Sequence, residues 1–349
     1  MRFWLLSLTV LLLLSTPLSG QVGGLFTYDF LSLPASARIS ALGATHIAVV
    51  DDDVNLAGAN PALLNPAMHQ QLTFSHAFHP AGIQHGYVAG GWYRESWQTT
   101  FHGSLRYADY GTFDLTNTTG QVEGEFKAAE YGITVGAARP VYERLTAGVN
   151  LRFVTSRLES YRSLGVAADL ALLYQDTARD FTLTFVAKHM GRQLKTYREG
   201  DQEPLPFEMQ VGLAKKLRYL PFRFSIIYRY FDRWNILYDD PNQTEDNIFL
   251  GDVATERSAS SIWFDNFFRH FVFNGELLLG RNENFRLRFG YSHLLRKEMA
   301  LGEFRSLAGF TFGAGVKINR FRLDYGRTNL HLGSGVNHLS ISTNLREFR

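Results

Sequence analysis

Three consecutive aspartates are the densest set of potential ligands in the sequence. Asp51, Asp52 and Asp53 could offer several carboxylate oxygens to a hard cation such as Ca²⁺. The residues around them lack the spacing and the glycine of an EF-hand loop. Aspartate also commonly caps a helix, and residues 54–64 carry a short helical pattern directly after it. We therefore interpret these aspartates as a helix cap that pairs with arginines inside the fold, rather than as a cation site.

Other residue types capable of catalysis show no local arrangement that would support it. His76 and His79 are three residues apart, a spacing that points strand side chains to opposite faces. No Gly-x-Ser-x-Gly motif occurs, and the absence of cysteine excludes disulfides, thiolate metal sites and cysteine nucleophiles. We expect no catalytic residue, no metal and no cofactor. A hydrolase whose groups come from separate strands is the open alternative.

Composition limits the class of protein. The chain has 349 residues, of which 45% are hydrophobic, 14% aromatic and 19% charged, and this excludes a disordered chain. The formal net charge of +2 gives no general surface for nucleic acid. The mean hydropathy of -0.13, and the lack of long apolar runs beyond the N-terminus, exclude a bundle of membrane-spanning helices. A soluble globule or a transmembrane β-barrel remains.

The N-terminus has the pattern of an export signal. Arg2 precedes an apolar stretch and a region of small residues that ends at Gly20. The apolar stretch is shorter than the roughly 20 residues that a spanning helix needs. We predict a cleaved signal peptide over residues 1–20, with a membrane anchor as the alternative.

From residue 70 onward the sequence alternates with period two, as strands with two different faces do. In one strand Phe222, Phe224 and Ile226 alternate with Arg223 and Ser225. About fourteen such strands can be counted, an even number as a single-chain bacterial barrel needs. We predict an all-β fold: an antiparallel transmembrane β-barrel over residues 70–349. A soluble β-sandwich would also alternate.

The lengths of the connections favour the barrel over the sandwich. Short gaps follow the even-numbered strands, and every long gap follows an odd-numbered strand. Outer-membrane barrels have this asymmetry, with short periplasmic turns and long surface loops. The predicted surface loops are residues 108–124, 194–206, 233–267 and 294–307.

The segment before the barrel, residues 21–69, is predicted to be a short, partly helical plug. A lumen of fourteen strands is too wide to be filled by the side chains of the strands alone. Its distinctive residues are Ser36, Ala37, Arg38, Gly43, the three aspartates, and the Asn60-Pro61 pair that we interpret as a turn.

The loop over residues 233–267 is a candidate docking site for a partner. It contains Tyr238, Asp239 and Asp240 and ends in an aromatic segment with Trp263 and Phe264. Clustered exposed aromatics often mark an interaction surface. A lid over the barrel mouth and a ring of aromatics at the lipid interface are the alternatives. Arg257 and Arg305, in the outer loops, could reach lipopolysaccharide phosphates.

The plug carries a family resemblance. Ser36-Ala37-Arg38, Ala41-Leu42-Gly43, Asp51-Asp52-Asp53 and Asn60-Pro61-Ala62 resemble the N-terminal signature of the FadL-like fourteen-stranded barrels of Bacteroidetes, and within them the PorQ-type barrels of the type IX secretion system. The resemblance implies a non-enzymatic component of the attachment complex in the outer membrane. The implied partners are a PorZ-like surface protein, a PorU-like sortase, a PorV-like barrel and anionic lipopolysaccharide.

Two functions therefore follow from the sequence. In the first, the barrel anchors a PorZ-like partner at the cell surface for cargo attachment. In the second, it is a FadL-like transporter that passes small hydrophobic molecules across the outer membrane. The second predicts an apolar pocket near the mouth of the barrel.

Overall fold

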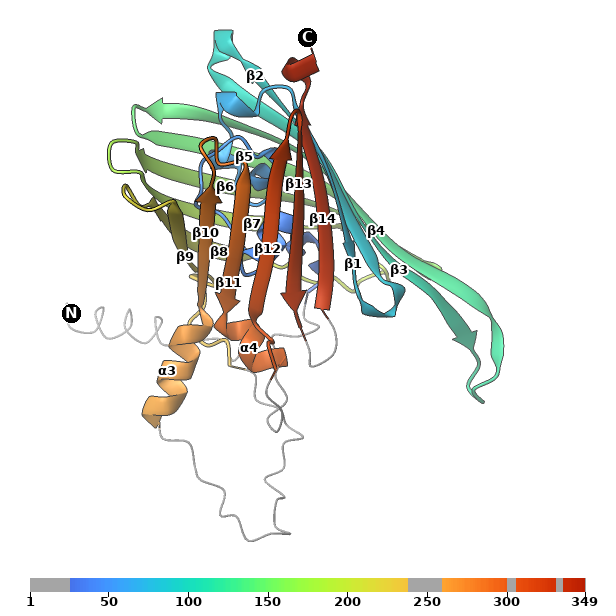
Figure 1. The fold of residues 1–349 in the computed structure, drawn as a ribbon. Coiled ribbons are helices and arrows are strands. Elements are labelled where there is room, and N and C mark those ends of the chain that lie inside the picture. Colours follow the sequence, from blue (N-terminus) through green and yellow to red (C-terminus); the bar gives the residue numbers. More distant parts are fainter. Residues whose placement is uncertain (1–25, 238–258, 300–305, 331–334, 349) are drawn as a thin grey trace, which may run out of the picture.

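Within the residues that the structure describes, 26–237, 259–299, 306–330 and 335–348, fourteen antiparallel strands close into one barrel in a computed structural model (Figure 1). Each strand pairs with its neighbours in the sequence, and β1 closes the barrel against β14 with Gln71 opposite Asn344. The strands are β1 (Gln71–Phe78), β2 (Gln84–Arg94), β3 (Thr99–Thr116), β4 (Val122–Tyr142), β5 (Leu145–Leu158), β6 (Tyr161–Asp176), β7 (Phe181–Lys195), β8 (Glu208–Lys216), β9 (Phe222–Tyr228), β10 (Phe271–Leu279), β11 (Phe285–Ser292), β12 (Phe310–Ile318), β13 (Phe321–Asn329) and β14 (Gly335–Asn344). The predicted fold and strand number are confirmed.

The predicted surface loop over residues 108–124 is wrong. β3 and β4 continue through most of it as a long hairpin that extends past the neighbouring strands, and only residues 117–121 form a turn (Figure 1). A β-bulge explains why the sequence suggests a loop here: the register of β3 against β4 shifts between Asp109 and Thr112. The extra residue reverses the alternation of inward and outward side chains, so the period-two pattern breaks there although the strand does not end.

Alternation along each strand divides the wall into two chemical faces. On β5 the inward residues Asn150, Arg152 and Val154 are buried, while Leu151 and Phe153 point outward and are exposed. An apolar outer face over a polar lumen is typical of a barrel in lipid. No helix among the described residues is both long and apolar enough to cross a membrane.

The two ends of the barrel differ as predicted. Short turns such as residues 143–144 and 319–320 lie at one end, where the C-terminus is. The helices α3 (Ala259–Arg269) and α4 (His293–Met299) lie at the opposite end (Figure 1). These helices occupy parts of the predicted loops 233–267 and 294–307, and residues 196–207 connect β7 to β8.

The segment before β1 fills the lumen. It forms η1 (Asp29–Ser32), α2 (Ala37–Ala41), η2 (Val54–Gly58), η3 (Pro61–Leu63) and η4 (Pro66–Met68). The predicted interrupted helix over residues 54–64 is therefore two short 3-10 helices. Plug side chains such as Leu56, Leu63 and Met68 are fully buried in one apolar cluster with Tyr87 and Ile227 of the wall. The predicted signal peptide lies outside the described residues.

Candidate functional site

The first part of the plug motif docks α2 against β12, β13 and β14. The Ser36 hydroxyl caps α2 by accepting from the amide of Ile39, and the Ala37 amide donates to the Ser340 hydroxyl over 2.8 Å. The backbone of α2 comes so close that a Cβ on Gly326 would lie 2.1 Å from the carbonyl oxygen of Ala37. Gly326 is therefore needed for the plug to approach the wall.

Gly43 turns the chain after α2. Its φ of +67° lies in the left-handed region that favours glycine. Its amide donates to the hydroxyl of Thr311 on β12 over 2.8 Å, and that hydroxyl donates to the carbonyl of Ala41 over the same distance. The turn is thus held to the wall at both ends.

Arg38 lies at the centre of a buried ion-pair network, which we call the Arg38 cluster. Its guanidinium is 2.7 Å from Asp51, 3.1 Å from Asp53 and 3.1 Å from Glu276 on β10. Burial by itself would lower the pKa of Arg38, but these carboxylates hold it well above its usual value. The cluster joins two separate parts of the plug to the barrel wall.

Four arginines of the wall complete the Arg38 cluster. Arg223 and Arg288 contact Glu276 at 2.6 and 3.0 Å, and Arg322 contacts Asp52 at 3.0 Å. Arg286 faces Asp51 at 3.8 Å. Burial alone would raise the pKa of Asp51, but the Arg38 and Arg223 guanidiniums hold it well below its usual range. All three aspartates thus have arginine partners, and Asp53 also caps η2 by accepting from the amide of Asn55.

A second set of polar contacts holds η2 and η3. The Asn60 amide group donates to the carbonyl of Ile47 over 2.7 Å and to the hydroxyl of Thr184 over 2.9 Å. Arg152 donates to the carbonyl of Gly58 over 2.6 Å and pairs with buried Asp169. Pro61 begins η3, which is capped by Asn60. The plug is therefore tied to opposite sides of the barrel.

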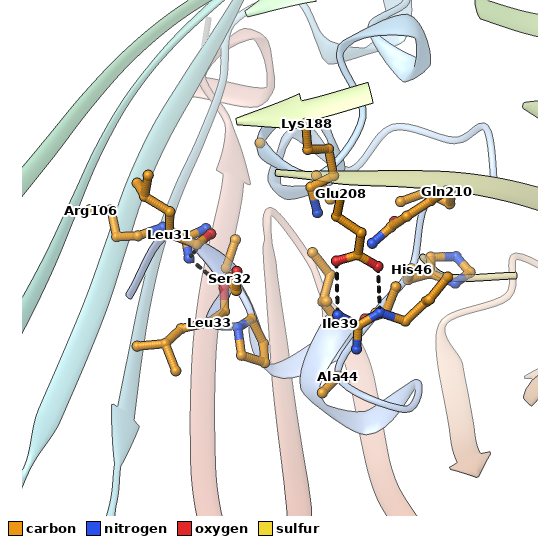
Figure 2. Close-up of a pocket in the computed structure, with 17 residues that line it drawn as sticks. Leu31, Ser32, Leu33, Ile39, Ala44, His46, Arg106, Lys188, Glu208 and Gln210 are labelled. Atoms are coloured by element: carbon orange, nitrogen blue, oxygen red, sulfur yellow. Dashed lines mark hydrogen bonds and ion pairs between the residues drawn. The ribbon is translucent and has the colours of Figure 1, made fainter. Parts of the chain in front are cut away.

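A small cavity remains between the plug and the wall (Figure 2). Glu208 pairs with Arg229 through two hydrogen bonds of 2.7 and 2.9 Å, and Arg106 donates to the carbonyls of Phe30, Leu31 and Leu33. The cavity volume is about 30 Å³, room for one or two water molecules. It is too small for a hydrocarbon ligand.

A larger pocket lies at the outer mouth, between the start of the plug and the β3–β4 hairpin. We call it the outer pocket. Its volume is about 520 Å³, within the range of small-molecule sites. Its walls are largely apolar, and they consist of Phe26, Thr27, Tyr28, Asp29, Tyr110, Phe113, Phe126, Ala128, Glu130, Leu158, Tyr197 and Glu203.

The bulge in β3 shapes the outer pocket. Before the bulge the inward residues of β3 have even numbers, as Arg106 and Ala108 do. After it Phe113 pairs with the inward-facing Phe126 of β4, and their rings stack with centroids 5.3 Å apart. Gly111 within the bulge has a φ of +85°. The bulge thus turns Phe113 toward the lumen side.

Of the five predicted docking residues, the structure describes Trp263 and Phe264. Tyr238, Asp239 and Asp240 lie outside the described residues, as do Arg257 and Arg305. Trp263 and Phe264 lie on α3 and are 48% and 55% exposed. Trp263 stacks on Phe267 with ring centroids 5.4 Å apart. The exposed aromatics are therefore held on a helix at the outer end of the barrel.

The transporter hypothesis predicts an apolar pocket near the mouth, but the residues of the outer pocket were not identified from the sequence. The signal that could have located this pocket is the break in the period-two pattern around residues 109–111. Beyond this break aromatic Phe113 takes an inward position, where polar residues are expected. Glu276, the partner of Arg38 on the barrel wall, was missed as well, because it lies 238 residues away and has no local motif.

No protein-family model matches the sequence, and no curated protein matches it. Solved structures do match. The CymD monoaromatic hydrocarbon channel has a TM-score of 0.55 and 14% identity, covering 92% of this chain and 99% of that one. A deltaS2 mutant of the TodX monoaromatic hydrocarbon channel has a TM-score of 0.51 and 12% identity, covering 89% and 97%. A FadL homologue of Pseudomonas aeruginosa has a TM-score of 0.47 and 11% identity, covering 89% and 98%.

The chain therefore has the FadL-like barrel fold of outer-membrane channels. At 14% and 12% identity the CymD and TodX matches show the barrel fold alone, and neither supports the PorQ part of the predicted resemblance.

Proposed function

We propose that this chain is a non-enzymatic outer-membrane channel that takes up small hydrophobic molecules, with the outer pocket as the first binding site. The outer pocket is the observation that carries the proposal: it is apolar, opens at the mouth and has the volume of a small-molecule site. Two proteins of the same fold are named as channels for monoaromatic hydrocarbons. The plug closes the lumen below the pocket, so passage requires the plug to move or a route through the wall.

Binding of a fluorescent hydrophobic probe tests this function. Phenylnaphthylamine added to the purified barrel in detergent should become fluorescent on binding, and Phe113→Ser should weaken that binding about tenfold, because about 1.5–3 kcal/mol accompanies burial of a phenyl ring. Phe153→Ser is the matched control, since Phe153 is exposed to a similar degree on the outer face of β5. Equal binding by both variants would contradict the assignment. Uptake of toluene by whole cells with and without the barrel then measures transport.

The anchoring function is the second candidate. The exposed aromatic face of α3 supports it, as does a plug that is held by buried ion pairs rather than poised to open. In this reading the barrel sits in the outer membrane beside a PorU-like sortase and a PorV-like barrel, contacts anionic lipopolysaccharide and holds a PorZ-like protein through α3. A barrel that bound hydrophobic probes only at its lipid-facing wall would favour it.

A pull-down from mild detergent tests the anchoring function. Recovery of PorZ-like and PorU-like proteins with the wild-type barrel, and their loss with Trp263→Ser plus Phe264→Ser, would establish it. Phe312→Ser on the lipid-facing side of β12 serves as the control. If the double variant retains these partners, α3 is not the docking site.

A further inference from the structure

We infer that the outer pocket selects hydrophobic molecules that carry a protonated amine, and this inference rests on the proposed channel function. The lining combines two kinds of group. Six of the twelve lining residues are aromatic, three are carboxylates and none is basic. The carboxylates are Asp29 of the plug, Glu130 of β4 and Glu203 of the loop between β7 and β8.

Glu130 is the innermost of the three carboxylates. It is 5% exposed and faces inward with Ala128, beside the Phe113–Phe126 stack. One of its oxygens accepts from the Tyr110 hydroxyl over 2.6 Å, which fixes the carboxylate at the apolar wall. A charged carboxylate at an apolar wall is costly unless a cation or water compensates it. A neutral hydrocarbon would leave the Glu130 carboxylate without a cation, whereas a protonated amine would compensate its charge.

The nearby cations are engaged elsewhere. Arg233 lies 5.5 Å from the Phe26 ring, but its guanidinium pairs with Asp232 and donates to the carbonyl of Phe207. Arg106 donates to plug carbonyls below the pocket. Lys127 and Arg157 have odd numbers on β4 and β5, whose inward residues at this level have even numbers, so they lie on the opposite face. No basic group lines the pocket to neutralise its carboxylates.

The aromatic rings suit the same ligand. An ammonium group binds to the face of an aromatic ring, and this attraction grows when both are removed from water. The Arg233–Phe26 contact is an instance of this interaction at the edge of the pocket. The carboxylates of the pocket would repel a ligand that carries a carboxylate of its own. The pocket is therefore matched to cationic aromatic or amphiphilic molecules and mismatched to fatty acids.

Competition among three phenylalkyl ligands of similar size tests the inference. Phenethylamine is cationic, propylbenzene is neutral and hydrocinnamate is anionic, and each is titrated against bound phenylnaphthylamine at neutral pH. We expect phenethylamine to compete about tenfold more strongly than propylbenzene, and hydrocinnamate to compete least. Glu130→Gln and, separately, Glu203→Gln should reduce the advantage of the amine. Asp114→Asn should not, because Asp114 follows Phe113 on the opposite face of the same strand.

The outcomes separate the inference from the proposed function. If phenylnaphthylamine does not bind, or Phe113→Ser leaves its binding unchanged, both are wrong. If it binds at Phe113 but the neutral and cationic ligands compete equally, the channel function stands and the inference is overturned. An advantage for the amine that Asp114→Asn lowers as much as the two pocket variants would show a general surface-charge effect, which also overturns it.

Discussion

Arg38 in the plug and Glu276 on β10 form a bidentate ion pair inside the barrel: Nε donates to Oε1 and Nη2 donates to Oε2, each over 3.1 Å. The same carboxylate also accepts from Arg223 and Arg288 of the wall. Glu276 therefore joins the first α-helix of the plug to two neighbouring strands. Because these groups are far apart in the sequence, the plug can be locked only after most of the barrel has formed.

Removing the Arg38 guanidinium should loosen the plug. Arg38→Gln leaves Asp53 without its ion-pair partner and Glu276 with two of its three, and breaking a buried pair typically costs about 3–5 kcal/mol. Since Arg223 and Arg288 still face Glu276, we expect a loss of about 3 kcal/mol. Urea unfolding in detergent gives the free energy, and planar-bilayer recordings should show a larger conductance.

An exposed ion pair is the control for that variant. The Arg179 guanidinium is 80% exposed and 3.9 Å from Asp176, so Arg179→Gln should change the free energy of unfolding by less than about 0.5 kcal/mol. A conductance of Arg38→Gln equal to that of the wild type would mean that the plug does not depend on this cluster.

A methyl group on the wall should also displace the plug. The Cβ of Gly148→Ala would lie 2.4 Å from the amide nitrogen of Ala62, a backbone atom that cannot turn away. We expect a loss of about 1–3 kcal/mol. Gly103→Ala is the matched control, because nothing lies within 4 Å of its Cβ position. Urea unfolding of the two variants compares them directly, and equal stabilities would contradict the tight contact between η3 and β5.

The sequence is enough to predict the barrel because its physical signal is repeated in every strand. Residues such as Leu151 and Arg152 alternate wherever a wall separates lipid from a polar lumen, and short turns show where strands end. The β3–β4 hairpin could not be predicted in the same way. Its outer part leaves the apolar band, and it is held by the cross-strand stack of Phe113 on Phe126, a pairing that is visible only once the bulge sets the register.

Contacts between plug and wall are equally hidden from local patterns. Asp53 could be assigned as a cap because the residue that it caps is two positions away. The acceptor of Arg38 on β10 depends on the tilt and closure of the whole barrel, so the sequence indicates that an arginine needs a partner without indicating which one. The outer pocket depends both on the bulge and on long-range contacts, since it joins the start of the plug to three strands and a loop.

Acid should weaken the docking of the plug through His46. Burial lowers the pKa of His46 from 6.5 to about 3, and the groups that face it are Glu276, Asp51, Arg38 and Arg223. Because the folded pKa lies below the unfolded one, the stabilisation is complete above pH 6.5 and is lost as the pH falls toward 3. Asp51 stays charged in this window, since its pKa is held low.

The pH dependence of unfolding measures this effect. Between about pH 4 and pH 6 the unfolding free energy should rise more steeply with pH in the wild type than in His46→Gln. The difference in slope should correspond to the uptake of up to about one further proton on unfolding. His76→Gln, half-buried on β1, is the control for the loss of an imidazole in general. Identical slopes for the wild type and His46→Gln would show that His46 does not titrate on unfolding.

A charge on the outer face should reveal which part of the barrel lies in lipid. Leu151 is 57% exposed near the middle of β5, and Tyr142 is 72% exposed at the end of β4. For a barrel in a bilayer, arginine costs about 2–4 kcal/mol at the midplane and about 0–1 kcal/mol near the interface. Leu151→Arg should therefore destabilise the barrel in phospholipid vesicles by at least about 1 kcal/mol more than Tyr142→Arg. A wall facing water would show small and equal costs, because an exposed arginine is then fully hydrated at both positions.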